Sequence, residues 1–311
     1  MELSILLFKK IISMAIILMT GYTLIKVRLA NPEHTPILST LLLYVFVPCI
    51  GFNSFMMPYS AEMFKVFIFA MAGGVFAQIF FIFLAWLVKK SPFKADPTEQ
   101  ACLAYTNCGN LLLPLISGLL SSEYVFYSSA FMAANIICLW THLPSLFAGR
   151  FKPDIKKILL NPNIIAIALG IIFFSCNLQL PAILADTVST IGGSTGVLSM
   201  LVTGMLLAEI DLRSVIMSMR CWAIFALRLI VFPLILIAVI FISGLAGSSE
   251  AARAVLLVIV MGGAAPTATG VINMSALFGG RAEFASAISA ITTLLCIITL
   301  PVIVYIYQIV C

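Results

Sequence analysis

The chain has 311 residues, of which 62% are apolar and only 9% charged, and its mean hydropathy is +1.18. Soluble domains are roughly 45–50% apolar and about 25% charged, so this composition excludes an ordinary water-soluble fold. The net charge of +5 does not indicate nucleic-acid binding, because the basic residues form short clusters between apolar segments rather than one patch.

Apolar segments follow one another along almost the whole chain. A spanning helix needs about 20 mostly apolar residues, because it rises about 1.5 Å per residue through a hydrocarbon layer about 30 Å thick. The sequence therefore predicts an all-α polytopic membrane protein with ten transmembrane helices, at approximately 5–25, 36–55, 63–88, 100–120, 124–148, 162–178, 183–208, 221–243, 252–278 and 283–308. Lys9 and Lys10 imitate a signal peptide, but no small-residue cleavage site follows Gly21, so we expect the first segment to be retained as a span.

The most polar connection, from Gly149 to Lys157, divides the chain into two halves. We expect a first five-helix repeat at 1–149, a loop at 150–160 and a second five-helix repeat at 161–311. With five spans in each half, the second half must enter the membrane in the opposite sense, which gives two inverted repeats. This architecture is characteristic of secondary transporters.

Basic residues mark the cytoplasmic side of a membrane protein. Loops after odd-numbered spans hold twelve of the 17 Lys and Arg: Lys26, Arg28, Lys89, Lys90, Lys94, Arg150, Lys152, Lys156, Lys157, Arg213, Arg220 and Arg281. This distribution predicts a multi-pass protein of the cell membrane, with both termini outside and the loop 149–157 in the cytoplasm.

Two spans carry helix-breaking residues near mid-membrane. Span four contains Asn107, Gly109, Asn110 and Pro114, and its counterpart in the second half, span nine, contains Pro266 within a run of small and hydroxyl residues. Proline removes a backbone donor and clashes with the carbonyl four residues earlier, so both helices should break. Broken helices at matching places in two inverted halves indicate a binding site at the midplane, where helix N-termini attract anions.

Polar side chains beside these breaks are the candidate ligand-binding groups. Asn107 and Asn110 are three residues apart, so they share one face of a helical turn and can bind a carboxylate or its protonated acid through their amides. Hydrogen bonding between helices is the alternative role for this pair. The predicted substrate-binding residues are Asn107, Asn110, Pro114, Pro266, Thr267 and Thr269, and residues that either line a path or bridge helices are Gln78, Asn135, Asn273, Thr292 and Thr293.

Other intramembrane residues have simpler interpretations. Arg228 either snorkels toward the cytoplasmic surface or pairs with a buried acceptor such as a substrate carboxylate, and we expect the first. His142 beside Pro144 is interpreted as structural, and Pro48 should kink span two. The chain contains no nucleotide-binding loop, metal-ligand cluster or nucleophile motif, so it predicts no catalytic residue, metal or cofactor.

Several short motifs, taken together, resemble the auxin efflux carrier family, which includes plant auxin carriers and bacterial malate and malonate permeases. The matching segments are Tyr44 to Pro48, Asn107 with Pro114, Asn161-Pro162-Asn163 with Gly170, Ala264 to Ala268, and Thr292-Thr293 with Pro301. Ile259 departs from the pattern, because it lies seven residues before Pro266 and offers no amide. The chain also lacks the long central loop of many plant carriers, so a compact permease fits better.

The resemblance implies ten helices with crossed breaks in helices 4 and 9. Helices 1, 2, 6 and 7 would form a scaffold, and helices 3–5 and 8–10 a mobile transport domain that carries the site in an elevator-like motion. Asn107 would contact the substrate carboxylate, while Pro114 and Pro266 would shape the crossing. The expected partners are a small organic anion, a coupling proton or sodium ion, the lipid bilayer and a second copy of the chain.

Alternatives to an organic-anion permease are a sodium-coupled carrier of the bile-acid type, a sensor or assembly protein built on a carrier fold, and a membrane-embedded enzyme. The enzyme is the least expected, because the apolar segments offer almost no carboxylate.

Overall fold

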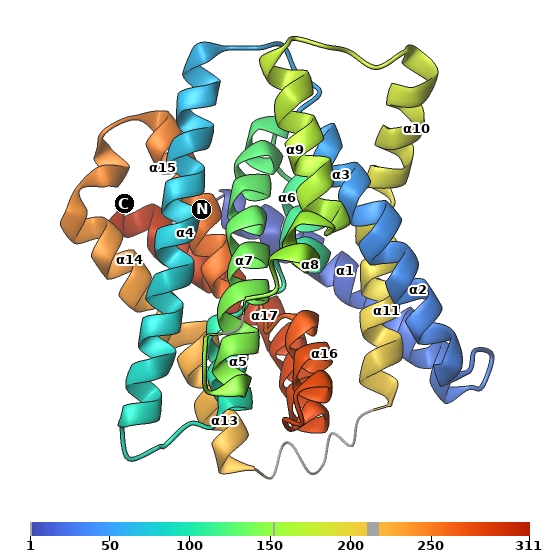
Figure 1. Ribbon diagram of the computed structural model, residues 1–311, viewed down its shortest axis with the longest axis vertical. Coiled ribbons are helices and arrows are strands. Elements are labelled where there is room, and N and C mark those ends of the chain that lie inside the picture. The colour runs from blue at the N-terminus through green and yellow to red at the C-terminus, as the bar shows by residue number, and fades with distance from the viewer. Residues whose placement is uncertain (1, 152, 210–217) are drawn as a thin grey trace.

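The computed structural model describes residues 2–151, 153–209 and 218–311. Within these residues the regular structure is helical, and the one β-type contact is an isolated antiparallel bridge between Thr106 and Thr267. The helices pack into a bundle in which α4 (Ala61–Lys90) and α7 (Ser122–Ala148) run side by side (Figure 1). Lys152 and Arg213, which enter the prediction of orientation, lie outside the described residues.

The first half of the chain, up to residue 149, contains the two long helices α4 and α7. Its other elements are α1 (Glu2–Lys26), a 3-10 turn (Pro32–His34), α2 (Thr35–Leu41), a π-helix (Leu42–Phe46), α3 (Val47–Asn53), α5 (Pro97–Ala104), a second π-helix (Cys108–Leu112) and α6 (Leu113–Ser117).

The second half ends with α17, which is almost as long as α4. Its elements are α8 (Ile155–Leu159), α9 (Pro162–Ser175), α10 (Ala182–Gly193), α11 (Thr195–Ala208), α13 (Met219–Ala226), a π-helix (Leu227–Val231), α14 (Phe232–Ser243), a 3-10 turn (Leu245–Gly247), α15 (Glu250–Ala264), α16 (Thr269–Leu277) and α17 (Ala282–Val310).

Seven helical segments of the described chain are long and apolar enough to cross a membrane: Phe8–Lys26, Pro32–Asn53, Ala61–Lys90, Ser122–Ala148, Ala182–Ala208, Met219–Ser243 and Ala282–Val310. They correspond to seven of the ten expected spans. The other three differ, because 100–120 and 252–278 are interrupted and α9 has only 14 residues. The all-helical membrane character agrees with the sequence, whereas the count of ten spans stays a prediction.

Each π-helix ends two residues before a proline: Pro48, Pro114 and Pro233. A proline cannot donate to the carbonyl four residues earlier and its ring crowds that carbonyl. A widened turn just before the proline relieves this conflict without ending the helix. The kink expected at Pro48 is therefore present as a π-turn.

Helices α1 and α11 approach closely because glycines face the opposite backbone. A Cβ added at Gly21 would lie 2.1 Å from the carbonyl oxygen of Leu201, and one added at Gly204 would lie 1.9 Å from that of Leu18. Both separations are far below contact distance, so only glycine allows this approach, as in other small-residue helix interfaces in membranes.

The helices pack into two groups. On one side α1 packs on α11, and α3 packs on α9 and α10. On the other, α4 packs on α5, α7 and α15, while α17 packs on α15 and α16. The two groups meet where α1 and α11 contact α17 and where α3 contacts α6 and α7.

Candidate functional site at the crossing of two broken helices

Two unwound segments cross in the interior of the bundle. The first connects α5 to the π-helix Cys108–Leu112, and the second connects α15 to α16. They pair through two backbone hydrogen bonds: Asn107 N–H donates to the Pro266 carbonyl at 2.8 Å, and Ala268 N–H donates to the Tyr105 carbonyl at 3.0 Å. Both segments therefore break where the sequence predicts, and the breaks touch.

The second break follows from Pro266. A residue before proline is pushed out of the helical region, and Ala265 has φ −67° and ψ 155°, so α15 ends at Ala264. In the first segment Tyr105 is extended, with φ −105° and ψ 134°. The two short stretches of extended backbone can thus provide hydrogen-bond partners for each other's N–H and C=O groups in the hydrocarbon region, where water cannot.

The positive ends of two half-helices open at this crossing. Asn107 precedes the helical segment Cys108–Ser117 and Ala268 precedes α16, and neither residue caps the following turn with its side chain. The first N–H groups of a helix have no partner within the helix and carry partial positive charge. An anion at the crossing would be attracted to both ends.

The C-terminal ends of α15 and α5, which carry partial negative charge, are hydrogen-bonded to side chains. Arg228 is fully buried and donates from Nη1 to the Gly263 carbonyl at 2.8 Å and from Nη2 to the Ala265 carbonyl at 2.9 Å. The expectation that Arg228 snorkels to the surface is wrong, because α15 ends inside the bundle and leaves carbonyls that need a donor. At the end of α5, Gln78 donates to the Ala104 carbonyl at 3.1 Å.

Asn107 is the polar side chain that remains available. It is only 6% exposed, and its amide makes no hydrogen bond with any described residue. Its amide atoms are not among the fully buried side-chain atoms that lack a partner, so water or a ligand can reach them. Asn107 lies before the helix, with ψ 63°, so the expectation that it shares a helical face with Asn110 is wrong, because its own backbone is not helical.

Asn110 joins three elements rather than standing free. Its amide donates to Thr269 Oγ1 at 3.4 Å, and its carbonyl accepts a short hydrogen bond from the hydroxyl of Ser199 on α11. It therefore links the first break to the start of α16 and to α11.

Side chains of α4 and α7 form a hydrogen-bonded network with the first unwound segment and the end of α5. Asn135 on α7 donates to Gln78 on α4 at 2.9 Å and to the Thr106 hydroxyl at 3.4 Å. Gln78 and Asn135 are both buried. We expect these residues either to line a path or to bridge helices, and the contacts described here are hydrogen bonds between helices.

The second segment is held in the same way by hydroxyl groups. Thr267 donates from its hydroxyl to the Cys102 carbonyl at 3.0 Å and from its N–H to the Thr292 hydroxyl at 3.2 Å, while Ser289 donates to the Thr267 carbonyl at 3.0 Å. Thr293 bonds within its own helix. Asn273, in contrast, is exposed on α16.

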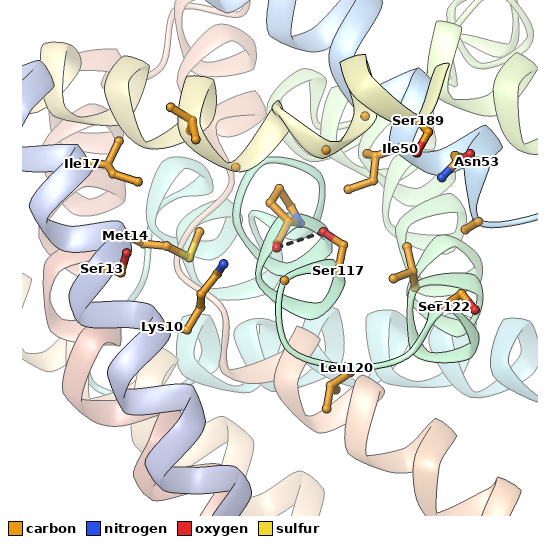
Figure 2. Close-up of a pocket in the computed structure, with 18 residues that line it drawn as sticks. Lys10, Ser13, Met14, Ile17, Ile50, Asn53, Ser117, Leu120, Ser122 and Ser189 are labelled. Carbon is orange, nitrogen blue, oxygen red and sulfur yellow. Dashed lines mark hydrogen bonds between the residues drawn. The ribbon is translucent and has the colours of Figure 1, made fainter. Parts of the chain in front are cut away.

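A cavity of about 370 Å³ lies between α1, α3, α10 and α11 on one side and α6 and α7 on the other, and Pro114 is the predicted substrate-binding residue that lines it. Figure 2 shows Lys10 of α1 extending toward the end of α6, where Ser117 donates to the Pro114 carbonyl at 3.1 Å. The other labelled polar groups are Ser13, Asn53, Ser122 and Ser189. Lys10 is the only charged residue among those that line the cavity, and no described carboxylate pairs with it. The volume is within the range of small-molecule sites, about 300–1,000 Å³.

An ion cluster fixes the far end of α5. Glu99 is fully buried and binds Arg220 at the start of α13, with Arg220 Nη2 to Glu99 Oε2 at 2.7 Å, and Arg281 before α17, at 2.8 Å. Arg281 also pairs with Asp96, which caps α5. Burial raises the pKa of Glu99, but the hydrogen bonds from Arg220, from the Asp96 N–H and from Arg281 outweigh it, so the pKa is lower than usual.

Comparison with known families decides what kind of protein carries this site. The sequence model of a family described as "Membrane transport protein" matches residues 6–154 and 151–304. The chain belongs to this family. No curated protein matches the chain.

The membrane transport protein family is the auxin efflux carrier family that the motifs resemble, so that recognition is confirmed. The malate and malonate branch stays a prediction. The two matched segments meet at residues 151–154, within the expected loop 150–160. Membership indicates a transport function rather than catalysis.

Some groups of this membrane transport protein escaped the sequence interpretation. The sequence presents Lys10 as a signal-peptide-like feature and as a basic residue on the side opposite the cytoplasm. Its place within an apolar helix is the sign in the sequence that it faces a cavity. Glu99 precedes a broken span, and Arg220 and Arg281 were expected on the same membrane side, so their pairing was open to prediction. The role of Arg228 depends on where α15 ends, which the residues around Arg228 do not indicate.

Proposed function

We propose that this membrane transport protein is a secondary carrier of a small organic anion, such as a mono- or dicarboxylate, which binds at the crossing of the two broken helices. The observation that carries the proposal is the Asn107 amide, which is 6% exposed, does not cap the helix that follows it and lies where two uncapped helix N-termini open. An amide and backbone N–H groups are suitable donors for a carboxylate.

The electrostatic asymmetry of the crossing supports an anion over a cation. The carbonyl-bearing ends of α5 and α15 are occupied by Gln78 and Arg228, whereas the N–H-bearing ends are open. The described crossing contains no carboxylate, and the charged residue of the adjacent cavity is Lys10. A cation would meet the positive side chains of Arg228 and Lys10 and no negative one.

The cavity in Figure 2 suggests how the anion reaches the site. It separates α1, α3, α10 and α11 from α6 and α7, which correspond to the expected scaffold and transport domain. In the proposed elevator mechanism the second group slides along the first and carries the crossing with it. Lys10 would attract the anion from the water that fills the cavity.

The test is counterflow into proteoliposomes with labelled malate, malonate, lactate and indole-acetate. At least one anion should exchange above empty liposomes, and Asn107→Ala should lower the rate by about tenfold or more, as expected when roughly 1.5 kcal/mol or more of charge-assisted hydrogen bonding is lost. Asn273→Ala is the matched control, because its side chain is exposed and makes no described hydrogen bond. Exchange of none of these anions, or an Asn107→Ala rate equal to wild type, would contradict the proposal.

A further inference from the structure

A second cavity, of about 330 Å³, shares no lining residue with the cavity of Figure 2. It lies between α4, α5 and α7 and is lined by Ile79, Ile82, Phe83, Ala85, Trp86, Lys89, Gln100, Ala104, His142 and Leu146. His142 is the one residue of this lining that can gain or lose a proton near neutral pH. It lies on α7, near the predicted cytoplasmic end.

His142 is directly connected to Tyr105. The Tyr105 hydroxyl lies 2.8 Å from His142 Nδ1 and 3.0 Å from the Cys138 carbonyl. The hydroxyl has a single hydrogen, so it donates to one of these two acceptors at a time. When His142 is doubly protonated, Nδ1 carries a hydrogen and can no longer accept, so the hydroxyl must accept from Nδ1 and donate to Cys138.

Tyr105 belongs to the crossing itself. It is fully buried, its carbonyl accepts from the Ala268 N–H, and the next residue forms the bridge to Thr267. A change at the Tyr105 hydroxyl is therefore separated from the backbone of the candidate binding site by one side chain. The second cavity is linked to the crossing through this single residue.

Few other charges surround His142. Lys89 of α4 faces the same cavity, and α5 presents Gln100 and Tyr105. On α7 its neighbour is Cys138, α16 carries no ionisable residue, and Asp154, whose N–H donates to the Trp140 carbonyl, pairs with Lys157 at 3.3 Å. No carboxylate pairs with His142 among the described residues.

The buried carboxylate of the described chain, Glu99, is not available for proton exchange. It is held by two arginines at the far end of α5, which keeps it ionised at neutral pH. Within the part of the chain that the structure describes, His142 is thus the group nearest the crossing that can titrate in the physiological range.

We propose that His142 is the proton-exchanging residue of the carrier, and that its protonation, transmitted by Tyr105, couples a proton to movement of the anion. This inference rests on the proposed transport function. In the balanced step, neutral His142 carries its hydrogen on Nε2 and gains one proton from hydronium on Nδ1, which makes it an imidazolium and leaves a water molecule. The Tyr105 hydroxyl turns its hydrogen from Nδ1 to the Cys138 carbonyl and accepts from Nδ1–H, and the reverse change returns the proton from Nδ1 to water after the crossing has moved.

The experiment compares two measurements in the same proteoliposomes. The first is anion uptake driven by a pH gradient imposed in either direction, and the second is counterflow at equal pH on both sides, which needs no proton coupling. Wild type should show gradient-driven uptake at least about fivefold above that without a gradient, the lower end of typical coupling factors. His142→Gln should lose this stimulation and keep counterflow.

Two further variants sharpen the result. His34→Gln is the matched control, because His34 ends the exposed turn Pro32–His34, and it should retain the stimulation. Tyr105→Phe removes the hydroxyl but keeps the ring that fills the core, so it should lower the ratio of gradient-driven uptake to counterflow even if His142→Gln folds poorly.

The outcomes separate this inference from the proposed function. A wild type that exchanges anions but ignores the pH gradient overturns the proton coupling and leaves the carrier function standing. Full stimulation in both His142→Gln and Tyr105→Phe also overturns it, and so does an equal loss of counterflow and stimulation in both variants, which would show a structural role. Absence of counterflow in wild type would instead contradict the carrier function itself.

Discussion

Arg228 shows how one side chain can stabilise a helix that ends inside the bundle. The carbonyl of a helix end needs a donor, and no water is present in the hydrocarbon region to supply one. Two nitrogen atoms of Arg228 donate to two carbonyls at the end of α15. The guanidinium also lies 5.5 Å from the centre of the Phe81 ring. Burial of the charge is tolerated because it compensates the negative end of α15.

Replacement of Arg228 by methionine should therefore destabilise the protein. Two buried carbonyls would lose their donor, at roughly 1–3 kcal/mol each, and the melting temperature in detergent should fall measurably. Arg228→Lys should give an intermediate value, since a lysine keeps the charge but not the forked geometry. Arg253→Met is the control, because that side chain is exposed. Equal melting temperatures for Arg228→Met and wild type would show that the carbonyls find other donors.

At the scale of the element, the half-helix α5 is fixed at both ends. Gln78 holds its last carbonyl, and Glu99 in its first turn is held by Arg220 and Arg281 from two other helices. A helix of eight residues is too short to be stable alone. Its position therefore depends on these tertiary contacts.

The pH dependence of stability should show how much the ionised Glu99 and its two arginines contribute to the fold. The pKa of Glu99 is below its ordinary value of 4.5, so its ionised form stabilises the fold fully above that value, and the stabilisation is lost as the pH falls through the lower folded-state pKa. Glu99→Gln should lower the melting temperature at pH 7, and the difference from wild type should shrink as the pH falls below about 4.5.

Lys157→Gln provides the comparison for that measurement. It removes an exposed ion pair with Asp154, 3.3 Å long, and exposed pairs contribute only about 0–1 kcal/mol. A Glu99→Gln variant as stable as Lys157→Gln at pH 7, or a difference from wild type that does not depend on pH, would contradict a structural role for the cluster.

The elements also show which parts of the fold were predictable. Proline and glycine identified both breaks, because their effect on the backbone is local and does not depend on the neighbours. The pairing of the two breaks followed only from the expected inverted halves. The helical face assigned to Asn107 and Asn110 was wrong because the end of a helix depends on tertiary hydrogen bonds, which a local pattern does not contain.

At the scale of the whole molecule, the proposed mechanism needs two bodies that slide past each other. Their contact includes a hydrogen bond between the hydroxyls of Ser54, just after α3, and Ser129 on α7, with the oxygens 3.0 Å apart. Both side chains are buried. A covalent link at this point would hold the two groups of helices in the arrangement described.

The double variant Ser54→Cys and Ser129→Cys should form a disulfide on oxidation, since the side chains already meet at the required range. Counterflow should then fall to the level of empty liposomes and return on reduction, while binding of the anion, measured by protection against thermal unfolding, should persist. Wild type and the single variants, treated with the same oxidant, control for the native cysteines. Continued counterflow with the disulfide formed would show that α3 and α7 need not move relative to each other.

The bridge between Thr106 and Thr267 is antiparallel, and an antiparallel pair looks the same after a half turn. Each segment therefore supplies the same two groups to the other: the carbonyl of the residue before the bridge and the N–H of the residue after it. The two residues of the bridge can therefore differ in their side chains without loss of these two hydrogen bonds, because the bonds use only main-chain atoms.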